Sequence, residues 1–311
     1  MRSLKASSVS LAAMGMLVLG LSGCTTPSPA APLGSEAPQS TEAPQSTPTA
    51  PDQTAALKAL EQQFSARVGV SALDTITGER ITYRADERFG YASTLKVFAA
   101  AVLLHDVPAS ERQTVVTFTA ADVEAAGYSP VTAESTETGL TLSQLAEAVV
   151  RRSDNTAMNL ILERLGGPAA LDAALTEQGD DPSEVVNSEP ALNAIEPGGT
   201  DDTSTPAAFT ANLSHLIDAS YLSTDDRTIL LDWMTGNATG DTLIRAGAPS
   251  GWIVADKSGG AGGIRNDIAV VTPPDGHPIV VTIFTNTLDP EAEYDNALVA
   301  GVAGIVLSGL E

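Results

Sequence analysis

Residues 252–285, WIVADKSGGAGGIRNDIAVVTPPDGHPIVVTIFT, decide the fold of this 311-residue chain. Three runs within this stretch are rich in Val and Ile, at Trp252–Lys257, Asp267–Thr272 and Pro278–Thr285. Such runs are typical of buried strands, and Pro273-Pro274-Asp275-Gly276 between the last two is typical of a turn. We therefore expect three neighbouring strands near the carboxyl end.

Two more strands are expected near the other end of the domain. Val68–Leu73 and Arg80–Arg84 flank a turn-rich segment, Asp74–Glu79. Because two strands alone would leave a sheet face uncovered, the two ends of the domain must meet in one sheet. Ala55–Arg67 and Glu291–Leu310 have helical apolar patterns and are expected to pack on that sheet. The sequence thus predicts a five-stranded antiparallel sheet flanked by N- and C-terminal helices.

The stretch between the two groups of strands is predicted to be helical. Thr205-Pro206 has the N-cap and first-turn proline of one helix. The fold class is therefore α+β, with an α/β lobe from residues 53–89 and 246–311 and an inserted all-helical lobe from residues 90–245. A pocket between two such lobes is a common place for a site. Apolar periodicity places the other helices at Leu95–Leu104, Leu142–Arg151, Asn155–Leu165, Pro168–Gln178 and Arg227–Met234.

Residues 1–23 have the pattern of an export signal. Two basic residues precede an apolar run, residues 9–21, that is too short to span a membrane. Leu21-Ser22-Gly23-Cys24 resembles the lipobox of bacterial lipoproteins, which implies cleavage before Cys24 and lipidation of this cysteine. The alternative is an ordinary signal peptide with a stray cysteine. Since Cys24 is the chain's only cysteine, no intrachain disulfide is available.

Residues 24–52 are predicted to be a tether. They are rich in Thr, Pro, Ser and Ala, and they hold too little apolar surface to fold. We expect Cys24 to carry the lipid and the segment after it to be disordered. The catalytic domain is then expected to comprise residues 53–311.

The charge of the chain excludes some partners. The chain has 39 acidic and 16 basic residues, and its formal net charge of −23 argues against nucleic acid and against electrostatic docking on anionic lipid. His105, His215 and His277 are scattered without the spacing of metal ligands. We therefore expect neither a metal site nor a cofactor.

Ser93-Thr94-Leu95-Lys96 is the first candidate for chemistry. It opens a predicted buried helix, so the serine hydroxyl lies where backbone N–H groups and the positive end of the helix dipole can support an anion. Lys96 returns to the same helical face three residues later, within reach of the serine. A buried lysine that loses its charge can take the serine's proton. Ser-x-x-Lys also arises by chance.

Three further segments carry candidate groups. Ser153-Asp154-Asn155 either aims a hydroxyl and an amide at the cleft or merely caps a helix. Lys257-Ser258-Gly259 ends a strand with a cation and with a glycine that lets another chain approach. Glu189 and Asn193, four apart in a loop, could hold one water between them for general-base chemistry. The chain has only four lysines, at 5, 58, 96 and 257, so finding two of them in these motifs weighs against chance.

In this order, the motifs resemble the class A serine β-lactamases of the penicillin-binding protein and β-lactamase superfamily. The motifs are Ser93-x-x-Lys96, Ser153-Asp154-Asn155 and Lys257-Ser258-Gly259. The Glu189–Asn193 loop resembles class A in particular, as does Tyr128-Ser129-Pro130-Val131. The similarity runs from about residue 54 to 310. It implies a β-lactamase/transpeptidase-like fold and a serine acyl-enzyme.

The resemblance also implies a role for each catalytic group. Ser93 attacks the lactam carbonyl, and its proton passes to Lys96 or, through water, to Glu189. The backbone N–H groups of Ser93 and Gly260 form the oxyanion hole. Ser153 relays a proton to the departing lactam nitrogen, with Lys257 nearby.

Further residues are implied to bind the substrate. Lys257 holds the substrate carboxylate together with a serine and an arginine, an asparagine holds the side-chain amide, and a tyrosine forms one wall of the cleft. Glu189 and Asn193 then activate the water that frees the enzyme. The implied substrate-binding set is Tyr128, Asn155, Asn193, Ser258, Gly259, Gly260 and Arg265.

The chain departs from the family pattern at three places. Asn187 stands where the family usually has an arginine paired with the loop-end aspartate, here Asp202. The loop has an extra residue around Glu196, and the segment before Arg265 is one residue short. The first two differences predict a looser loop and slower deacylation. The third puts the role of Arg265 in doubt.

Two other functions share part of this pattern. A penicillin-binding D-alanyl-D-alanine carboxypeptidase or transpeptidase shares the serine–lysine chemistry but lacks the water-holding glutamate. A non-catalytic envelope-binding protein on this fold would be expected to lose at least one of the five catalytic groups, all of which are present. We therefore expect a monomeric β-lactamase that acts on penicillins and cephalosporins and confers resistance. It is expected to be an exported bacterial lipoprotein, anchored to the cell membrane through Cys24.

Overall fold

The structure, a computed structural model, describes residues 51–218, 220–289 and 291–310. The predicted signal peptide, the lipobox with Cys24 and nearly all of the predicted tether lie outside the described residues.

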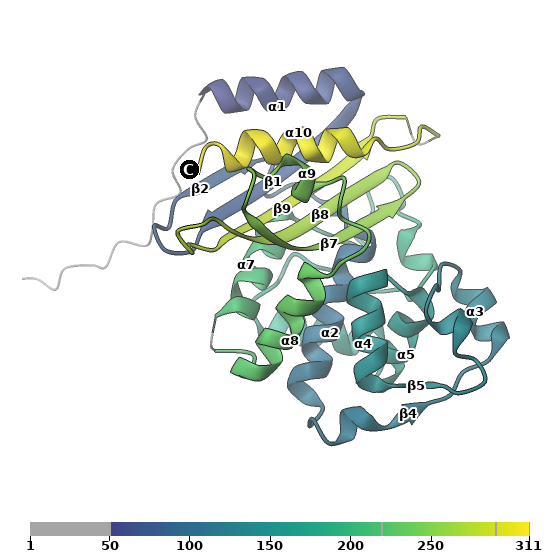
Figure 1. The fold of residues 1–311 in the computed structure, drawn as a ribbon. Helices are drawn as coiled ribbons and strands as arrows, with labels where there is room; N and C mark the ends of the chain where they lie inside the picture. Colours follow the sequence, from purple (N-terminus) through teal and green to yellow (C-terminus); the bar gives the residue numbers. More distant parts are fainter. Residues whose placement is uncertain (1–50, 219, 290, 311) are drawn as a thin grey trace, which may run out of the picture. The chain divides into compact units, whose positions relative to one another are not determined.

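The five long strands form one antiparallel sheet in the order β2-β1-β9-β8-β7 (Figure 1). Strand β1 pairs with β9 along its whole length, from Ala66 opposite Thr287 to Asp74 opposite Ile279. The sheet therefore joins the two ends of the domain, as the sequence predicts. The strands are β1 (Ala66–Asp74), β2 (Arg80–Tyr83), β7 (Ile253–Ala261), β8 (Ile264–Thr272) and β9 (Ile279–Thr287).

Three helices cover one face of this sheet: α1 (Pro51–Phe64), α10 (Asn296–Leu307) and the short α9 (Ile244–Gly247) (Figure 1). The predicted first helix ends at Phe64 because Ser65 adopts a positive φ and turns the chain into β1. The predicted last helix begins only at Asn296, because the Asp295 side chain caps it by accepting from the Ala297 N–H.

The segment between the strands is mainly helical, and its central helix is buried. Every residue of α2 from Lys96 to Leu104 is buried in the larger hydrophobic core. The helices are α2 (Lys96–Asp106), α3 (Ala120–Ala126), α4 (Leu142–Arg152), α5 (Asn155–Leu165), α6 (Pro168–Glu177), α7 (Pro206–Ile217) and α8 (Thr224–Thr235), with the 3₁₀ turns η1 (Ala92–Leu95), η2 (Glu111–Gln113), η3 (Thr132–Glu134) and η4 (Ala191–Asn193).

The predicted helical lobe is not wholly helical. Two short ladders lie within it, β3 (Phe89–Gly90) with β6 (Thr203–Ser204) and β4 (Val115–Val116) with β5 (Leu140–Thr141). Helix α7 packs on the second face of the sheet, against β1 and β9. The two lobes are therefore continuous where α7 meets the sheet. The two short ladders were not predicted because strands of two residues are too short to show a periodicity.

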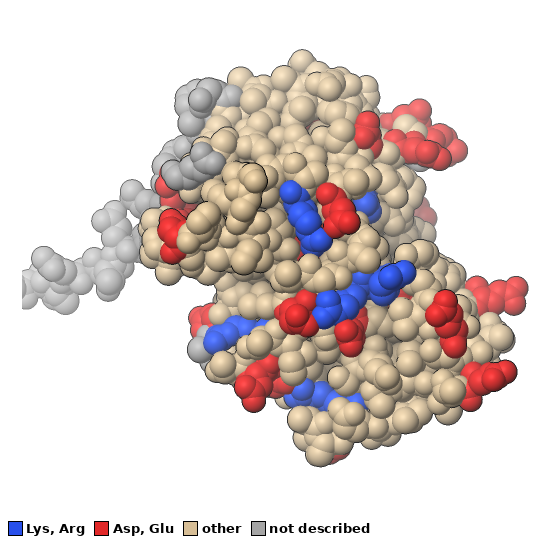
Figure 2. All heavy atoms as spheres, viewed as in Figure 1, with Lys and Arg blue, Asp and Glu red and all other residues tan. Residues whose placement is uncertain are grey.

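Surface charges and helix lengths add two observations. Acidic and basic side chains are interspersed on the face of the domain that Figure 2 shows, so this face has no continuous basic patch that would attract a polyanion.

None of the helices described for residues 51–310 reaches the length and apolarity that crossing a membrane requires.

Candidate active site

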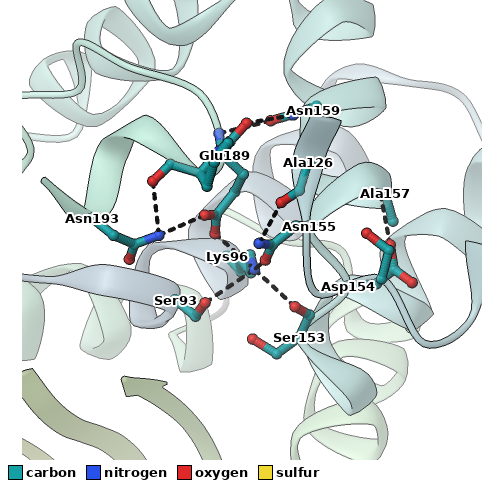
Figure 3. Close-up of polar contacts among 12 residues, drawn as sticks. Ser93, Lys96, Ala126, Ser153, Asp154, Asn155, Ala157, Asn159, Glu189 and Asn193 are labelled. Carbon is teal, nitrogen blue, oxygen red and sulfur yellow. Dashed lines mark hydrogen bonds and ion pairs between the residues drawn. The ribbon is translucent and has the colours of Figure 1, made fainter. Parts of the chain in front are cut away.

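Ser93 lies in the turn η1, which leads directly into the buried helix α2. Lys96 is the first residue of α2, and its Nζ donates to Ser93 Oγ at 3.0 Å (Figure 3). The predicted spacing of three residues thus brings the amine to the hydroxyl.

Lys96 is enclosed by acceptors. Its Nζ donates to the Ser153 carbonyl at 2.8 Å and to Asn155 Oδ1 at 2.5 Å, and it lies 2.8 Å from Glu189 Oε1. Burial lowers the pKa of Lys96, and the nearby carboxylates of Glu189 and Asp154 oppose that shift only in part. A lowered pKa makes the neutral amine accessible, and only the neutral amine can accept a proton from Ser93.

Ser153-Asp154-Asn155 joins α4 to α5, and each residue has its own task. Asp154 is the N-cap of α5, where its side chain accepts from the Ala157 N–H at 2.9 Å. Ser153 adopts a left-handed φ of 57°, which ends α4. Asn155 donates to the Ala126 carbonyl at 2.9 Å while its oxygen accepts from Lys96. Asp154 confirms the cap interpretation, whereas Ser153 and Asn155 contact the two lysines, and their role in a substrate cleft stays a prediction.

Lys257 approaches the same place from strand β7. Its buried Nζ donates to Ser153 Oγ at 3.1 Å and to the Ser258 carbonyl at 2.6 Å. Burial, followed by the charge of Lys96, lowers the pKa of Lys257 to about 7. Each of the two serine hydroxyls, Ser93 and Ser153, therefore has its own buried lysine.

Glu189 enters from the loop between α6 and β6. Asn159 of α5 fixes its backbone, donating from Nδ2 to the Glu189 carbonyl and accepting from the Glu189 N–H, both at 2.9 Å (Figure 3). Sequence reasoning missed Asn159, although it lies four residues after Asn155 and hence on the same face of α5.

The Glu189 carboxylate keeps one oxygen available. Asn193 Nδ2 donates to Glu189 Oε2 at 2.7 Å. Oε1 is 2.8 Å from Lys96 Nζ, an ion-pair contact. Beyond this ion pair, neither Glu189 Oε1 nor Asn193 Oδ1 accepts a hydrogen bond from the described residues. Two buried acceptors four residues apart can together take both protons of one water.

Strand β7 presses closely on the turn that carries Ser93. A Cβ at Gly259 would lie 2.9 Å from the Tyr91 carbonyl oxygen and 3.1 Å from the Ser93 nitrogen. Only glycine leaves room for this approach, which brings the Ser93 N–H beside the strand that continues into Gly260.

Arg265 stands opposite Gly260 on β8, beside the strand that carries Ser258. Its Nε donates to Asn296 Oδ1 at 2.7 Å, and its guanidinium lies 4.9 Å from the centre of the Tyr294 ring. Ser258 Oγ is 2.6 Å from Thr239 Oγ1. Arg265 is thus held at the edge of this strand despite the short segment before it, and its role as a carboxylate ligand stays a prediction.

The last predicted site residue, Tyr128, is exposed. Its carbonyl accepts from the Asn155 N–H at 2.9 Å, while 57% of the residue is accessible to solvent. This places an exposed aromatic ring on the segment beside Asn155, consistent with a cleft wall. Among the described residues, no group of three or more His, Cys, Asp or Glu side chains could hold a metal.

At loop position 187, hydrogen bonds from an uncharged asparagine to Asp202 replace the arginine–aspartate ion pair of the family pattern. Its Nδ2 donates to Asp202 Oδ2 at 2.6 Å, and its backbone N–H donates to Asp202 Oδ1 at 3.0 Å. The loop that carries Glu189 is therefore closed by hydrogen bonds between its own two ends.

Comparisons with known proteins agree on one family. A family model described as the beta-lactamase enzyme family matches residues 52–308. A β-lactamase of Bacillus amyloliquefaciens is 48% identical over 253 residues, which span 81% of this chain and 82% of the relative. A β-lactamase of Amycolatopsis lactamdurans is 44% identical over 252 residues, 81% of this chain and 83% of the relative. The crystal structure of a class A β-lactamase from Clostridium kluyveri is similar at 41% identity with a TM-score of 0.81, covering 83% of this chain and 98% of the other.

Proposed function

This chain belongs to the class A β-lactamases, serine hydrolases that open β-lactam rings and so confer resistance, and from that premise we propose a role for each residue of its site. The family does not favour the carboxypeptidase alternative. The observation that carries the proposal is that Ser93 Oγ and Glu189 Oε1 converge on one buried amine, the Nζ of Lys96.

Acylation begins with attack by Ser93 on the lactam carbonyl. The direct 3.0 Å contact and the lowered pKa support Lys96 as the group that takes the proton of Ser93. The alternative path runs through a water to Glu189. The backbone N–H groups of Ser93 and Gly260 receive the developing oxyanion.

The lactam nitrogen must gain a proton as the ring opens. Ser153 Oγ supplies it, and Lys257, which donates to that oxygen at 3.1 Å, limits the cost of the negative charge left on it. The proton given up by Ser93 returns to Ser153 through Lys96 and its surroundings, so that no charge accumulates.

Substrate is held from two sides. Lys257, Ser258 and Arg265 bind its carboxylate from the strands, as expected for a cation and hydroxyl at one sheet edge. Asn155 and Tyr128 contact its side chain from the helical lobe. Lys257 is charged for this task only below its pKa of about 7.

Hydrolysis of the acyl-enzyme falls to Glu189 and Asn193. Glu189 Oε1 and Asn193 Oδ1 can together hold a water facing the ester of Ser93, and Glu189 accepts its proton when the water attacks. A protein lacking this pair would remain acylated.

The full chain is proposed to be an exported lipoprotein monomer attached through Cys24. The support for export and for the anchor is the sequence of residues 1–24 alone, and the monomeric state is proposed without a structural observation. Fractionation of expressing bacteria with a Cys24→Ala variant tests it. Wild-type protein in the membrane fraction and variant in the soluble fraction are expected, and an equal distribution would contradict the anchor.

The enzymatic proposal is tested with purified residues 53–311 and a chromogenic cephalosporin. We expect hydrolysis that Ser93→Ala lowers by at least about 10⁴-fold, because the nucleophile of the covalent path is gone. Intact-mass spectrometry should show a β-lactam adduct on wild type under quenched conditions and none on the variant. An adduct on Ser93→Ala would assign the nucleophile elsewhere.

A further inference from the structure

Asp202 is a buried carboxylate that closes the segment we call the Glu189 loop, residues 186–202. Only 1% of Asp202 is exposed. From within the loop it accepts the Val186 N–H at 3.1 Å and both Asn187 donors. No Lys, Arg or His among residues 51–310 forms an ion pair with it in the structure. Its negative charge is thus stabilised by neutral donors alone.

One donor to Asp202 comes from outside the loop, the hydroxyl of Tyr91. Tyr91 Oη lies 2.9 Å from Asp202 Oδ1, and the Glu184 carbonyl shares the same proton at 3.2 Å. The tyrosine is fully buried, with its ring stacked at 17° on Phe209. Burial, followed by the charge of Asp202, raises the pKa of Tyr91 well above its usual value of 10, so the phenol stays a donor.

Tyr91 also belongs to the turn that carries the nucleophile. Its carbonyl accepts from Thr94 Oγ1 at 2.7 Å and from the Thr94 N–H at 3.3 Å, and Ser93 lies two residues further on. Asn266 of β8 donates to the same carbonyl at 3.2 Å. One residue therefore holds the Ser93 turn with its backbone and the Glu189 loop with its side chain.

A pocket borders the second half of the loop. A cavity of about 910 Å³ lies between loop residues 193–200 and the ends of the strands, lined also by Phe89, Gly263 and Asn286. The loop is anchored in its first half by the buried Leu192 and by Asn159, and at its two ends by the hydrogen bonds to Asp202.

We propose that Tyr91 is a positioning residue for hydrolysis of the acyl-enzyme: through Asp202, its hydroxyl fixes the Glu189 loop relative to Ser93. This inference rests on the proposed role of Glu189. A displacement of the catalytic carboxylate by about 1 Å can cost about a hundredfold in rate. Because Asn187, which binds Asp202, lies only two residues before Glu189, an anchor on Asp202 affects the position of that carboxylate. With Lys96 as the group that takes the proton of Ser93, we expect acylation to be unchanged.

The test is Tyr91→Phe, which removes one oxygen and keeps the ring. We expect kcat to fall by about tenfold and KM to fall with it, leaving kcat/KM unchanged, because only the second step slows. Quenched samples should then contain mostly acyl-enzyme. Asp202→Asn, which weakens the acceptor instead, should give the same paired fall. A variant that merely misfolded in part would lower kcat and leave KM alone, and that result, or no change, would overturn the proposal.

Tyr83→Phe is the matched control. Tyr83 is also buried, and its hydroxyl donates to a carboxylate, Glu61 Oε2, at 2.7 Å, on β2 away from the site. Its loss should leave both kcat and KM unchanged. Glu189→Ala, run in parallel, separates the two ideas. If Glu189→Ala traps no adduct, the role proposed for Glu189 is wrong. If Glu189→Ala traps an adduct but Tyr91→Phe does not accumulate acyl-enzyme, only the role proposed for Tyr91 is wrong.

Discussion

The two halves of the active site are built in different ways. Ser93 and Lys96 lie where a turn enters α2, a helix buried along nearly its whole length. Glu189 lies in a loop that borders a pocket of about 910 Å³ at residues 193–200, and this loop is held by Asn159, by the buried Leu192 and by neutral hydrogen bonds to Asp202. Forming the acyl-enzyme therefore depends on a helix that is buried along nearly its whole length, whereas breaking it down depends on a loop held mainly by hydrogen bonds and one buried leucine.

This difference shows where rate can vary without loss of the fold. A change in α2 alters core packing and stability as well as chemistry. A change in the loop alters the position of a water-activating carboxylate and little else. Substitutions should thus separate the two steps of the reaction, and their effects should decrease with distance from Glu189.

The largest difference between the effects on deacylation and on acylation is expected for Glu189→Ala. Removing the general base should slow deacylation by about 10³-fold, while acylation of Ser93 by penicillin stays measurable because Lys96 remains. Intact-mass spectrometry over time should show a persistent adduct. Turnover equal to wild type, with no adduct, would contradict the role of Glu189. If acylation also collapsed, the path from Ser93 through water to Glu189 would be favoured over Lys96.

The pH dependence of acylation probes the rigid half. The pKa of Lys257 is about 7, so raising the pH through 7 removes the charge that faces the substrate carboxylate. We expect kcat/KM to fall by up to about tenfold per pH unit above that value. Lys257→Arg, which stays charged, should move the alkaline fall to higher pH. An unmoved profile would assign the titration to another group.

The same lysine has an expected effect on stability. In the unfolded chain its amine stays protonated to about pH 10.4, whereas in the folded protein it loses its proton above about 7. Below pH 7 the protein therefore bears the full cost of a buried charge, and this cost is relieved as the pH rises from 7 toward 10. The free energy of unfolding of the wild type, measured with urea and compared with that of Lys257→Met, should therefore increase over this range.

The smallest difference between the effects on deacylation and on acylation is expected for Asn187→Ala. It removes the 2.6 Å bond from Nδ2 to Asp202 but leaves the backbone donors, so deacylation should slow by only about threefold. Hydrogen exchange tests the looser loop directly. Amides of residues 186–203 should exchange faster than those of α5 in wild type and faster still in the variant. Exchange as slow as in the neighbouring helices would show that Asn187 does not loosen the loop.

Much of this arrangement can be predicted from the sequence. Strand patterns at both ends require a single sheet, and Ser93, Lys96, Ser153, Glu189 and Lys257 are marked by motifs with chemical meaning. The structure brings all five together. Periodicity also locates most helices, because their apolar faces pack on one core.

The supporting contacts could not be predicted in this way. Asn159, Tyr91 and Asp202 are single polar residues whose partners lie far away in the sequence, so no local pattern marks them. Their importance becomes visible only when the tertiary fold shows which donors and acceptors are buried together. The first and last residues of helices could not be predicted for a related reason. A cap such as Asp295 acts through the geometry of its side chain, which a pattern of hydrophobic residues does not mark.

The pairing of β1 with β9 links activity to the completion of synthesis. Until the chain up to Thr287 has left the ribosome, β1 can pair only with β2, and a two-stranded hairpin is marginally stable at best in water. Lys257 is translated nearly as late, long after Ser93. Strand pairing over such sequence separations is also intrinsically slow. We therefore expect a translation product that ends before Lys257 to lack both the complete sheet and the second lysine, and to be inert toward the antibiotic.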